Sequence, residues 1–231
     1  MSNLPPPAPD DELQVELSSV ELDPLPEEPD DCADALSLVF GREPSPPLVA
    51  ISLDALQDMI GHGSVETNRE VGGILVGRYA QTPQGLTTRL EDIVIADTAE
   101  ASLTHVTFTH HSWTEIHRQL DSRDDGGQIV GWYHTHPGFG PFLSAHDLFI
   151  QRNFFSHRGH IALVLDPIQR LFAVFGWQDE AIVKSAGCRV YASEDQRTEL
   201  TTLRETLRYA ADGPDSHSSG LKDWFGSMIR R

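Results

Sequence analysis

The stretch Gly131–Asp147, GWYHTHPGFGPFLSAHD, decides how the rest of the chain is interpreted. Side chains two residues apart on a strand point to the same face, so His134 and His136 would present two imidazoles side by side. Ser144 and Asp147 have the spacing of the N-cap and N3 positions of a capping box. If that helix start folds back over the strand, Asp147 completes a set of two histidines and one carboxylate.

Two interpretations of this stretch are open. Three protein ligands that leave one position for water are the pattern of a catalytic zinc site. The alternative is a strand, a turn and an ordinary capped helix, because an H-x-H pair is a weak signal in a chain with eleven histidines. A non-haem iron site uses similar ligands, but it usually pairs H-x-D with a distant histidine, which is not the pattern here.

Apolar periodicity outside this stretch predicts interleaved strands and helices. Strands are predicted over residues 71–80, 87–98, 105–109, 126–136, 160–167 and 170–177. Helices are predicted over residues 52–63, 112–122, 144–155 and 194–212. This irregular order predicts an α/β or α+β domain with a curved, mostly mixed β-sheet flanked by helices.

Composition divides the chain into three parts. Residues 1–47 hold ten of the fifteen prolines and twelve acidic residues against the single Arg42, so they carry −11 of the formal net charge of −18. We expect this acidic, Pro-rich tail to be disordered, with the apolar patch Ala33–Phe40 serving as a docking segment or forming a helix without a partner. Residues 48–212 are predicted to be the folded domain. Residues 213–231 are predicted to be a linker and an amphipathic segment that packs on the domain or docks on a partner.

Several functional classes are disfavoured by the same composition. A net charge of −18 argues against binding to nucleic acid, which depends on clustered Lys and Arg. The two cysteines, far apart in sequence, predict neither a disulfide nor a thiolate metal site. The amino terminus lacks the pattern of a signal peptide, and no stretch approaches the roughly 20 apolar residues of a membrane span. A cytoplasmic protein is therefore expected.

The combined motif resembles that of the JAMM (MPN+, Mov34/PAD-1-like) zinc metalloproteases. That motif is H-x-H, seven residues, Ser, two residues and Asp, with a glutamate far upstream. Residues 137–143 supply the gap of seven, and NREVGGILVGR matches the context of the upstream glutamate at Glu70. Glu66 is a poorer candidate because it lacks that context. The stretch Val130–Ser144 is similar to the proteasome-lid deubiquitinase branch, and a prokaryotic member is expected.

The resemblance covers roughly residues 48–180 and implies both a fold and a site. The fold would be an MPN/JAB domain, which is cytidine-deaminase-like. His134, His136 and Asp147 would bind one Zn²⁺ per chain. Glu70 would act as general acid and base, and Ser144 would hydrogen-bond the tetrahedral oxyanion or the bound water.

The implied activity is hydrolysis of an amide bond at the C-terminus of ubiquitin or a ubiquitin-like protein. One alternative is a processing peptidase for a ubiquitin-like sulfur carrier. Another is a non-catalytic MPN scaffold, which is disfavoured because all five motif residues are present. The acidic tail and the Leu221–Ile229 segment are candidate contacts for a protein partner. The segment after the motif passes quickly to a strand, which favours a shallow site, a small leaving group or a partner that grips the substrate.

Overall fold

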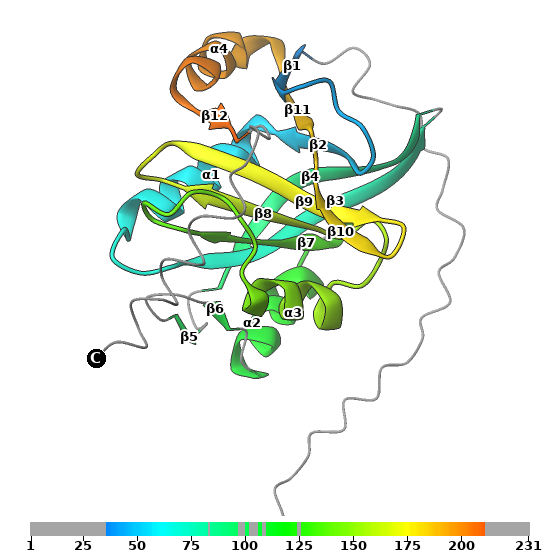
Figure 1. Ribbon diagram of the computed structural model, residues 1–231, viewed down its shortest axis with the longest axis vertical. Coiled ribbons are helices and arrows are strands. Elements are labelled where there is room, and N and C mark those ends of the chain that lie inside the picture. The colour runs from blue at the N-terminus through cyan, green and yellow to red at the C-terminus, as the bar shows by residue number, and fades with distance from the viewer. Residues whose placement is uncertain are drawn as a thin grey trace, which may run out of the picture.

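The computed structural model describes residues 36–82, 84–96, 100–101, 106–107, 110–123 and 126–210. Its centre is a curved, mixed sheet of ten strands in the order β1-β11-β2-β4-β3-β7-β8-β9-β10, with β12 paired to β9 (Figure 1). The strands are β1 (Leu36–Gly41), β2 (Leu48–Ser52), β3 (Gly72–Thr82), β4 (Gly85–Ile95), β7 (Gln128–Thr135), β8 (Ile161–Asp166), β9 (Leu171–Gln178), β10 (Ala181–Lys184), β11 (Gly187–Ala192) and β12 (Arg208–Tyr209). A separate pair consists of β5 (Glu100–Ala101) and β6 (Val106–Thr107). The helices are α1 (Leu53–Val65), α2 (His110–Asp121), α3 (Ala145–Phe154) and α4 (Arg197–Thr206), with the 3-10 turn η1 (Glu194–Gln196) before α4.

The helices cover both faces of the sheet. In Figure 1, α1 and α4 lie on one side of the sheet, and α2 and α3 lie on the other. Alternate residues of β7 serve the two faces, as strand geometry requires. The Tyr133 hydroxyl lies 2.8 Å from Nδ1 of His62 on α1, whereas the Trp132 indole N–H donates to Gln151 on α3 at 2.8 Å. A strand in this position is buried on both faces, which explains its long apolar run.

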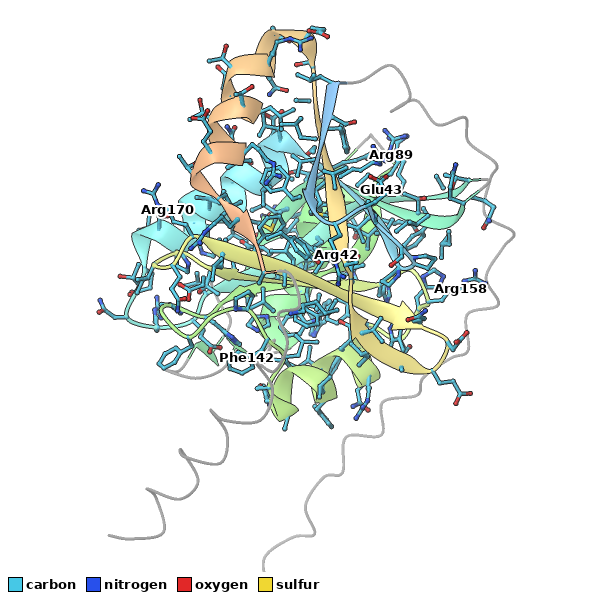
Figure 2. The ribbon with its side chains drawn as sticks, turned by 45° about the horizontal axis from the view of Figure 1, so that its top comes forward. Arg42, Glu43, Arg89, Phe142, Arg158 and Arg170 are labelled. Atoms are coloured by element: carbon cyan, nitrogen blue, oxygen red, sulfur yellow. The ribbon has the colours of Figure 1, made fainter. Side chains whose placement is uncertain are left out.

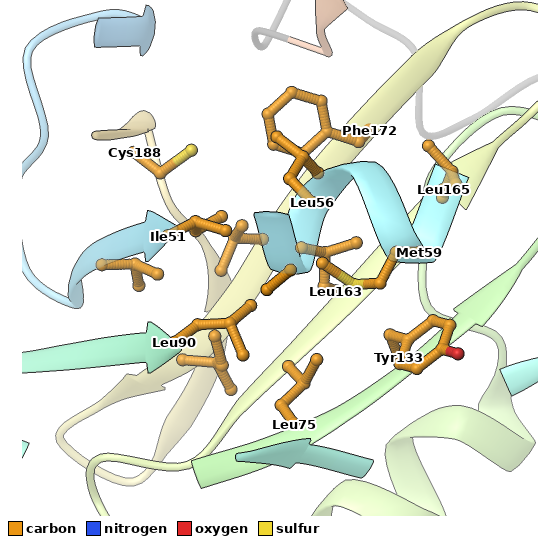
Figure 3. Close-up of a cluster of buried hydrophobic side chains, with 14 of the residues drawn as sticks. Ile51, Leu56, Met59, Leu75, Leu90, Tyr133, Leu163, Leu165, Phe172 and Cys188 are labelled. Atoms are coloured by element: carbon orange, nitrogen blue, oxygen red, sulfur yellow. The ribbon is translucent and has the colours of Figure 1, made fainter. Parts of the chain in front are cut away.

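The main core lies between α1 and the sheet (Figure 3). Leu56 and Met59 of α1 are fully buried against Leu75 and Leu163 of the sheet. Burying one such side chain contributes about 1.5–3 kcal/mol relative to leaving it exposed. This apolar cluster holds α1 against the central strands, which include β7.

The structure confirms the predicted cap of α1 and extends the helix. Ser52 Oγ accepts a hydrogen bond from Ala55 N at 3.2 Å. The helix continues through Gly61 and Gly63, where the sequence predicted its end. A Cβ on Gly63 would lie 2.8 Å from Cγ2 of Thr135, so glycine here allows α1 to approach β7 closely.

The folded part begins earlier than the predicted boundary at Leu48. Residues Leu36–Gly41 form β1, antiparallel to β11, and Phe40 is fully buried. Leu36–Phe40, the part of the apolar patch that the structure describes, is therefore neither a docking segment nor a helix but a strand of the central sheet. Its partner strand is remote in sequence, which is why local composition concealed it. Residues 1–35 and 211–231 lie outside the described residues, so the predicted disorder of the tail and the C-terminal amphipathic segment stay predictions.

Two predicted helices have different bounds in the structure. α4 ends at Thr206 rather than continuing to residue 212, because Leu207 is extended and the chain enters β12, parallel to β9. Tyr209 then donates its hydroxyl to Ser185 O at 2.8 Å. α2 begins at His110, two residues before the predicted cap at Ser112. Over the described ranges, no helix is both long and apolar enough to cross a membrane.

Candidate metal centre

The end of β7 brings two histidines to one face of the sheet. His134 is fully buried and His136 is 3% exposed. Their Nε2 atoms lie 3.1 Å apart. The ring of Trp132, two residues earlier on the same face, stacks on His134 with centroids 4.6 Å apart and planes 12° apart. Phe142, labelled in Figure 2, packs against His136 with ring centroids 4.5 Å apart.

The start of α3 delivers the carboxylate. Ser144 is the N-cap, and its Oγ accepts from Asp147 N at 3.2 Å. Oδ2 of Asp147 accepts from Ser144 N at 2.6 Å, so both halves of the predicted capping box are present. Oδ1 of Asp147 lies 3.5 Å from His134 Nε2, and Oδ2 lies 3.8 Å from His136 Nε2. The cap therefore holds the carboxylate beside both imidazoles.

The three side chains fit a small divalent cation. Each offers one ligand atom, and these atoms lie within 4.8 Å of one another. Two donors on one tetrahedral zinc ion are about 3.4 Å apart. The two imidazole nitrogens are 3.1 Å apart, Oδ1 of Asp147 lies 3.5 Å from that of His134, and Oδ2 lies 3.8 Å from that of His136. His136 Nδ1 lies 3.2 Å from Gly140 O, a contact that requires its proton on Nδ1 and leaves the Nε2 lone pair facing the cluster.

The electrostatics of the cluster favour a neutral His136 and an ionised Asp147. Burial, reinforced by His134, lowers the pKa of His136 to about 4, although Asp147 and Gly140 O act in the opposite direction. Burial alone would raise the pKa of Asp147. The charge of His134 and hydrogen bonds from His134 and Ser144 outweigh burial and hold that pKa well below its usual range. A neutral imidazole and an ionised carboxylate are the forms that coordinate a metal.

Glu70 reaches the cluster from a position two residues before β3. Val71 exchanges two hydrogen bonds with Thr135: Thr135 N donates to Val71 O at 2.8 Å, and Val71 N donates to Thr135 Oγ1 at 3.0 Å. Glu70 is 5% exposed, and its Oε1 lies 3.6 Å from His136 Nε2. Burial raises the pKa of Glu70 to about 7, with Asp147 adding to the effect and His134 opposing it. A buried carboxyl that titrates near neutrality beside such a cluster is a candidate for proton transfer.

The other residues considered from the sequence lie elsewhere. The carboxylate of Glu66 accepts from Asn68 N at 3.0 Å and pairs with Arg69 at 3.3 Å, away from the cluster. His146 is not a member of the cluster formed by the described residues. The side chains of His105, His110 and His111 lie outside what the structure describes.

Three buried residues around the centre were missed from the sequence: Trp132, Gln151 and Asp166. The first two have a local signal, because Trp132 shares the strand face of His134 and Gln151 follows Asp147 by one helical turn. Asp166 is a single carboxylate that ends an apolar strand, and only the folded arrangement shows what it contacts.

Comparison with known proteins agrees with this geometry. Residues 44–157 match the family described as JAB1/Mov34/MPN/PAD-1 ubiquitin protease. The chain belongs to this family. The predicted family and the mixed α+β fold of the MPN/JAB domain are both confirmed. The segment matched contains all five residues of the predicted motif.

The curated relatives in this family include proteasome and signalosome subunits. Ubiquitin carboxyl-terminal hydrolase RPN11 of Saccharomyces cerevisiae is 29% identical over 130 residues, which are 56% of this chain and 42% of that protein. The 26S proteasome regulatory subunit rpn11 of Schizosaccharomyces pombe is 32% identical over 123 residues, 52% of this chain and 39% of that one. COP9 signalosome complex subunit 5 of Candida albicans is 30% identical over 132 residues, 52% and 20% of the two chains. The aligned part thus spans less than half the length of each relative.

A solution structure of a protein from Desulfitobacterium hafniense is also similar, with a TM-score of 0.48 and 17% identity over 64% of this chain and 94% of that one.

Proposed function

We propose that this chain is a zinc-dependent isopeptidase or peptidase that hydrolyses an amide bond at the C-terminus of ubiquitin or a ubiquitin-like protein. The observation that carries the proposal is the buried cluster of His134, His136 and Asp147 with the carboxyl of Glu70 alongside. The substrate class is supported by the relatives, which include a ubiquitin carboxyl-terminal hydrolase.

In this proposal His134, His136 and Asp147 hold one Zn²⁺ per chain. When bound, the ion would polarise the scissile carbonyl and lower the pKa of a coordinated water. The two histidines would hold the ion from the end of β7, and Asp147 would hold it from the start of α3. Trp132 excludes water behind His134, because its ring stacks on that imidazole and is itself fully buried.

Glu70 is the proposed general base and acid. Its Oε2 is buried without a hydrogen-bond partner among the described residues, so it is an open acceptor inside the cluster. The carboxylate takes a proton from water as the oxygen attacks the amide carbon. It then returns a proton to the leaving nitrogen as the C–N bond breaks, which yields a carboxylate and an amine. Burial raises the pKa of Glu70 in the metal-free protein to about 7, which favours a carboxyl that exchanges protons near neutral pH.

Ser144 is the proposed oxyanion partner. Its Oγ accepts from Asp147 N, so the hydroxyl proton is available to donate to the oxygen that becomes negative during attack. The same side chain would therefore cap α3 and stabilise the transition state.

A smaller leaving group is the second candidate, as in the processing of a ubiquitin-like sulfur carrier. α3 and β8 are joined by only six residues, 155–160, so this part of the chain has no large insertion to grip a second protein. The chemistry would be the same. Contacts through the acidic tail or the Leu221–Ile229 segment are the proposed means of engaging a larger partner.

The decisive experiment incubates ubiquitin fusions and ubiquitin-like fusions with wild-type protein and with Glu70→Gln, read by intact mass. Cleavage is expected directly after the terminal glycine with wild type and not with Glu70→Gln, whereas Glu66→Gln, four residues away, keeps wild-type activity. Zinc analysis distinguishes the enzyme from a non-catalytic scaffold. A content well under one zinc per chain that His134→Ala leaves unchanged would contradict the proposed enzyme.

A further inference from the structure

Asp166 is a buried carboxylate next to the metal centre that the proposed mechanism does not use. It is fully buried at the end of β8. β8 runs parallel to β7, with Leu165 opposite Thr135, and His136 N donates to Leu165 O at 2.9 Å. This register places Asp166 beside the loop that leaves His136.

The Asp166 carboxylate accepts four backbone N–H groups. From the loop, Gly138 N donates to Oδ1 at 3.0 Å and Gly140 N donates to Oδ2 at 2.8 Å. From the β8–β9 turn, Ile168 N and Gln169 N donate to Oδ1 at 3.0 and 2.9 Å. One side chain therefore ties the loop after His136 to the neighbouring turn.

The loop needs such an anchor because of its backbone conformation. Gly138 and Gly140 have φ angles of 85° and 77°, a region that L side chains rarely adopt. Phe139 between them is 72% exposed, so the loop buries little apolar surface that could hold it in place. The two amides converge on Asp166 only in this tightly turned conformation.

The anchored loop in turn orients a proposed metal ligand. Nδ1 of His136 lies 3.2 Å from Gly140 O, the carbonyl of the same residue whose N–H is held by Asp166. A metal-ligating histidine usually donates its second ring N–H to such an acceptor, which fixes the tautomer and the plane of the ring. Gly140 alone thus links Asp166 to His136, through its N–H on one side and its carbonyl on the other.

We infer that Asp166 is a positioning residue for the metal centre: it holds the Gly138–Gly140 loop in the conformation in which Gly140 O orients His136. The inference rests on the proposed metal site. Its consequence is that Asp166 contributes to metal affinity in the folded protein and not only to folding. Loss of a partner one step removed from a metal typically weakens binding about 10- to 100-fold.

The test uses Asp166→Asn, which keeps the shape of the side chain but turns one acceptor oxygen into an NH₂ group that faces N–H donors. The Zn²⁺ dissociation constant of the full chain is measured by competition with a chromophoric chelator. The visible spectrum of the Co²⁺-loaded protein reports ligand geometry. Asp166→Asn is expected to bind Zn²⁺ about 10- to 100-fold more weakly, with an altered cobalt spectrum. Asp92→Asn is the control with the same substitution. Asp92 lies on β4 and pairs with Arg123 at 2.6 Å, so this variant should bind Zn²⁺ as wild type does.

Gly140→Ala tests the same path without touching the carboxylate. Its Cβ would meet nothing within 4 Å, so the positive φ is the main strain, and weaker Zn²⁺ binding is again expected. A folded Asp166→Asn protein with wild-type affinity and cobalt spectrum overturns the inference. If Asp166→Asn does not fold, wild-type affinity in Gly140→Ala overturns it instead. A wild-type chain that binds no Zn²⁺ overturns the proposed function rather than the role of Asp166.

Discussion

Trp132 donates its indole N–H to Oε1 of Gln151 at 2.8 Å, and Gln151 lies one helical turn after Asp147 on α3. This bond sets the register of the helix on the strand. Trp132 stacks on His134, and Gln151 shares a helix face with Asp147. The contact between β7 and α3 therefore also aligns the proposed histidine and carboxylate ligands.

Replacing Gln151 should cost both stability and metal affinity. Gln151 also donates to Phe155 O at 3.2 Å and to His160 O at 3.3 Å, so Gln151→Leu removes three hydrogen bonds of a fully buried side chain. We expect a loss of about 2 kcal/mol or more in the free energy of unfolding, measured by urea denaturation of the metal-free protein. Gln178→Leu, on the exposed end of β9, should change it by less than about 0.5 kcal/mol. Equal effects of the two substitutions would contradict the role of Gln151.

Ser144→Ala should separate the two roles of this residue. Loss of the N-cap is expected to cost about 1 kcal/mol of stability, and loss of the oxyanion donor should lower kcat about 100-fold or more. Ser52→Ala removes the N-cap of α1, whose hydroxyl also donates to Glu91 O at 3.0 Å. It should show a loss in stability at least as large and an unchanged kcat. Steady-state kinetics and thermal melts on both variants check this, and an unchanged kcat in Ser144→Ala would leave only the cap.

A divalent metal should stabilise the folded chain through this cluster. Zn²⁺ that binds only the folded state adds about 2.7 kcal/mol at a free concentration of 100 times Kd. Thermal melts with Zn²⁺ and with excess chelator should therefore differ for wild type and coincide for His134→Ala. Glu70→Gln should keep the difference, because Glu70 is proposed to move protons rather than to hold the ion. A zinc-dependent shift that persists in His134→Ala would place the metal elsewhere.

His160 should make stability depend on pH below neutrality. Burial, with a contribution from His157, lowers the pKa of His160 from 6.5 to about 4, and its Nδ1 accepts from His157 N at 3.2 Å. The unfolded chain takes up this proton near pH 6.5, whereas the folded protein resists it. The stabilising contribution is therefore fully present above pH 6.5 and is lost as the pH falls toward 4, by at most about 3 kcal/mol.

The measurement is urea denaturation between pH 4 and 7. His160→Gln should flatten this dependence relative to wild type. His117→Gln, on the exposed side of α2, should follow the wild-type curve. A His160→Gln curve parallel to wild type would rule out this histidine as the source.

Two glycines of α1 should respond to alanine with opposite signs. At Gly61 a Cβ would meet nothing within 4 Å, so Gly61→Ala should stabilise the protein by about 0.5–1 kcal/mol through helix propensity. At Gly63 the Cβ would lie 2.8 Å from Cγ2 of Thr135, the residue that pairs with Val71. Gly63→Ala should therefore destabilise the chain and disturb the position of Glu70. Differential scanning calorimetry distinguishes the two, and equal signs would contradict the close approach of α1 to β7.

The parts of the site that were predictable are those encoded by short sequence periods. The two-residue repeat of a strand places His134 beside His136, and the three-residue spacing of a capping box places Asp147 at the start of α3. The position of Glu70 came from resemblance to a family motif, because no local period connects it to a residue sixty-six positions later in the chain, His136.

The parts that were missed depend on contacts between distant segments. β1 is an apolar stretch within the acidic tail, and it forms a strand because it pairs with β11, which is remote in the sequence. β12 interrupts what reads as helical sequence because Arg208 and Tyr209 pair with β9. Asp166 resembles an ordinary turn residue until the loop from Gly138 to Gly140 is seen to lie against it.

The short pairing between Val71 and Thr135 also affects the order in which the site residues come together during folding. His134, His136 and Asp147 span fourteen residues, so their assembly closes only a small loop. Glu70 joins them only when β3 has paired with β7, a contact of high sequence separation and correspondingly slow formation. In the proposed mechanism, a nascent chain would therefore assemble the three proposed metal ligands before it gains the proposed base, and hydrolysis would wait until β3 has paired with β7.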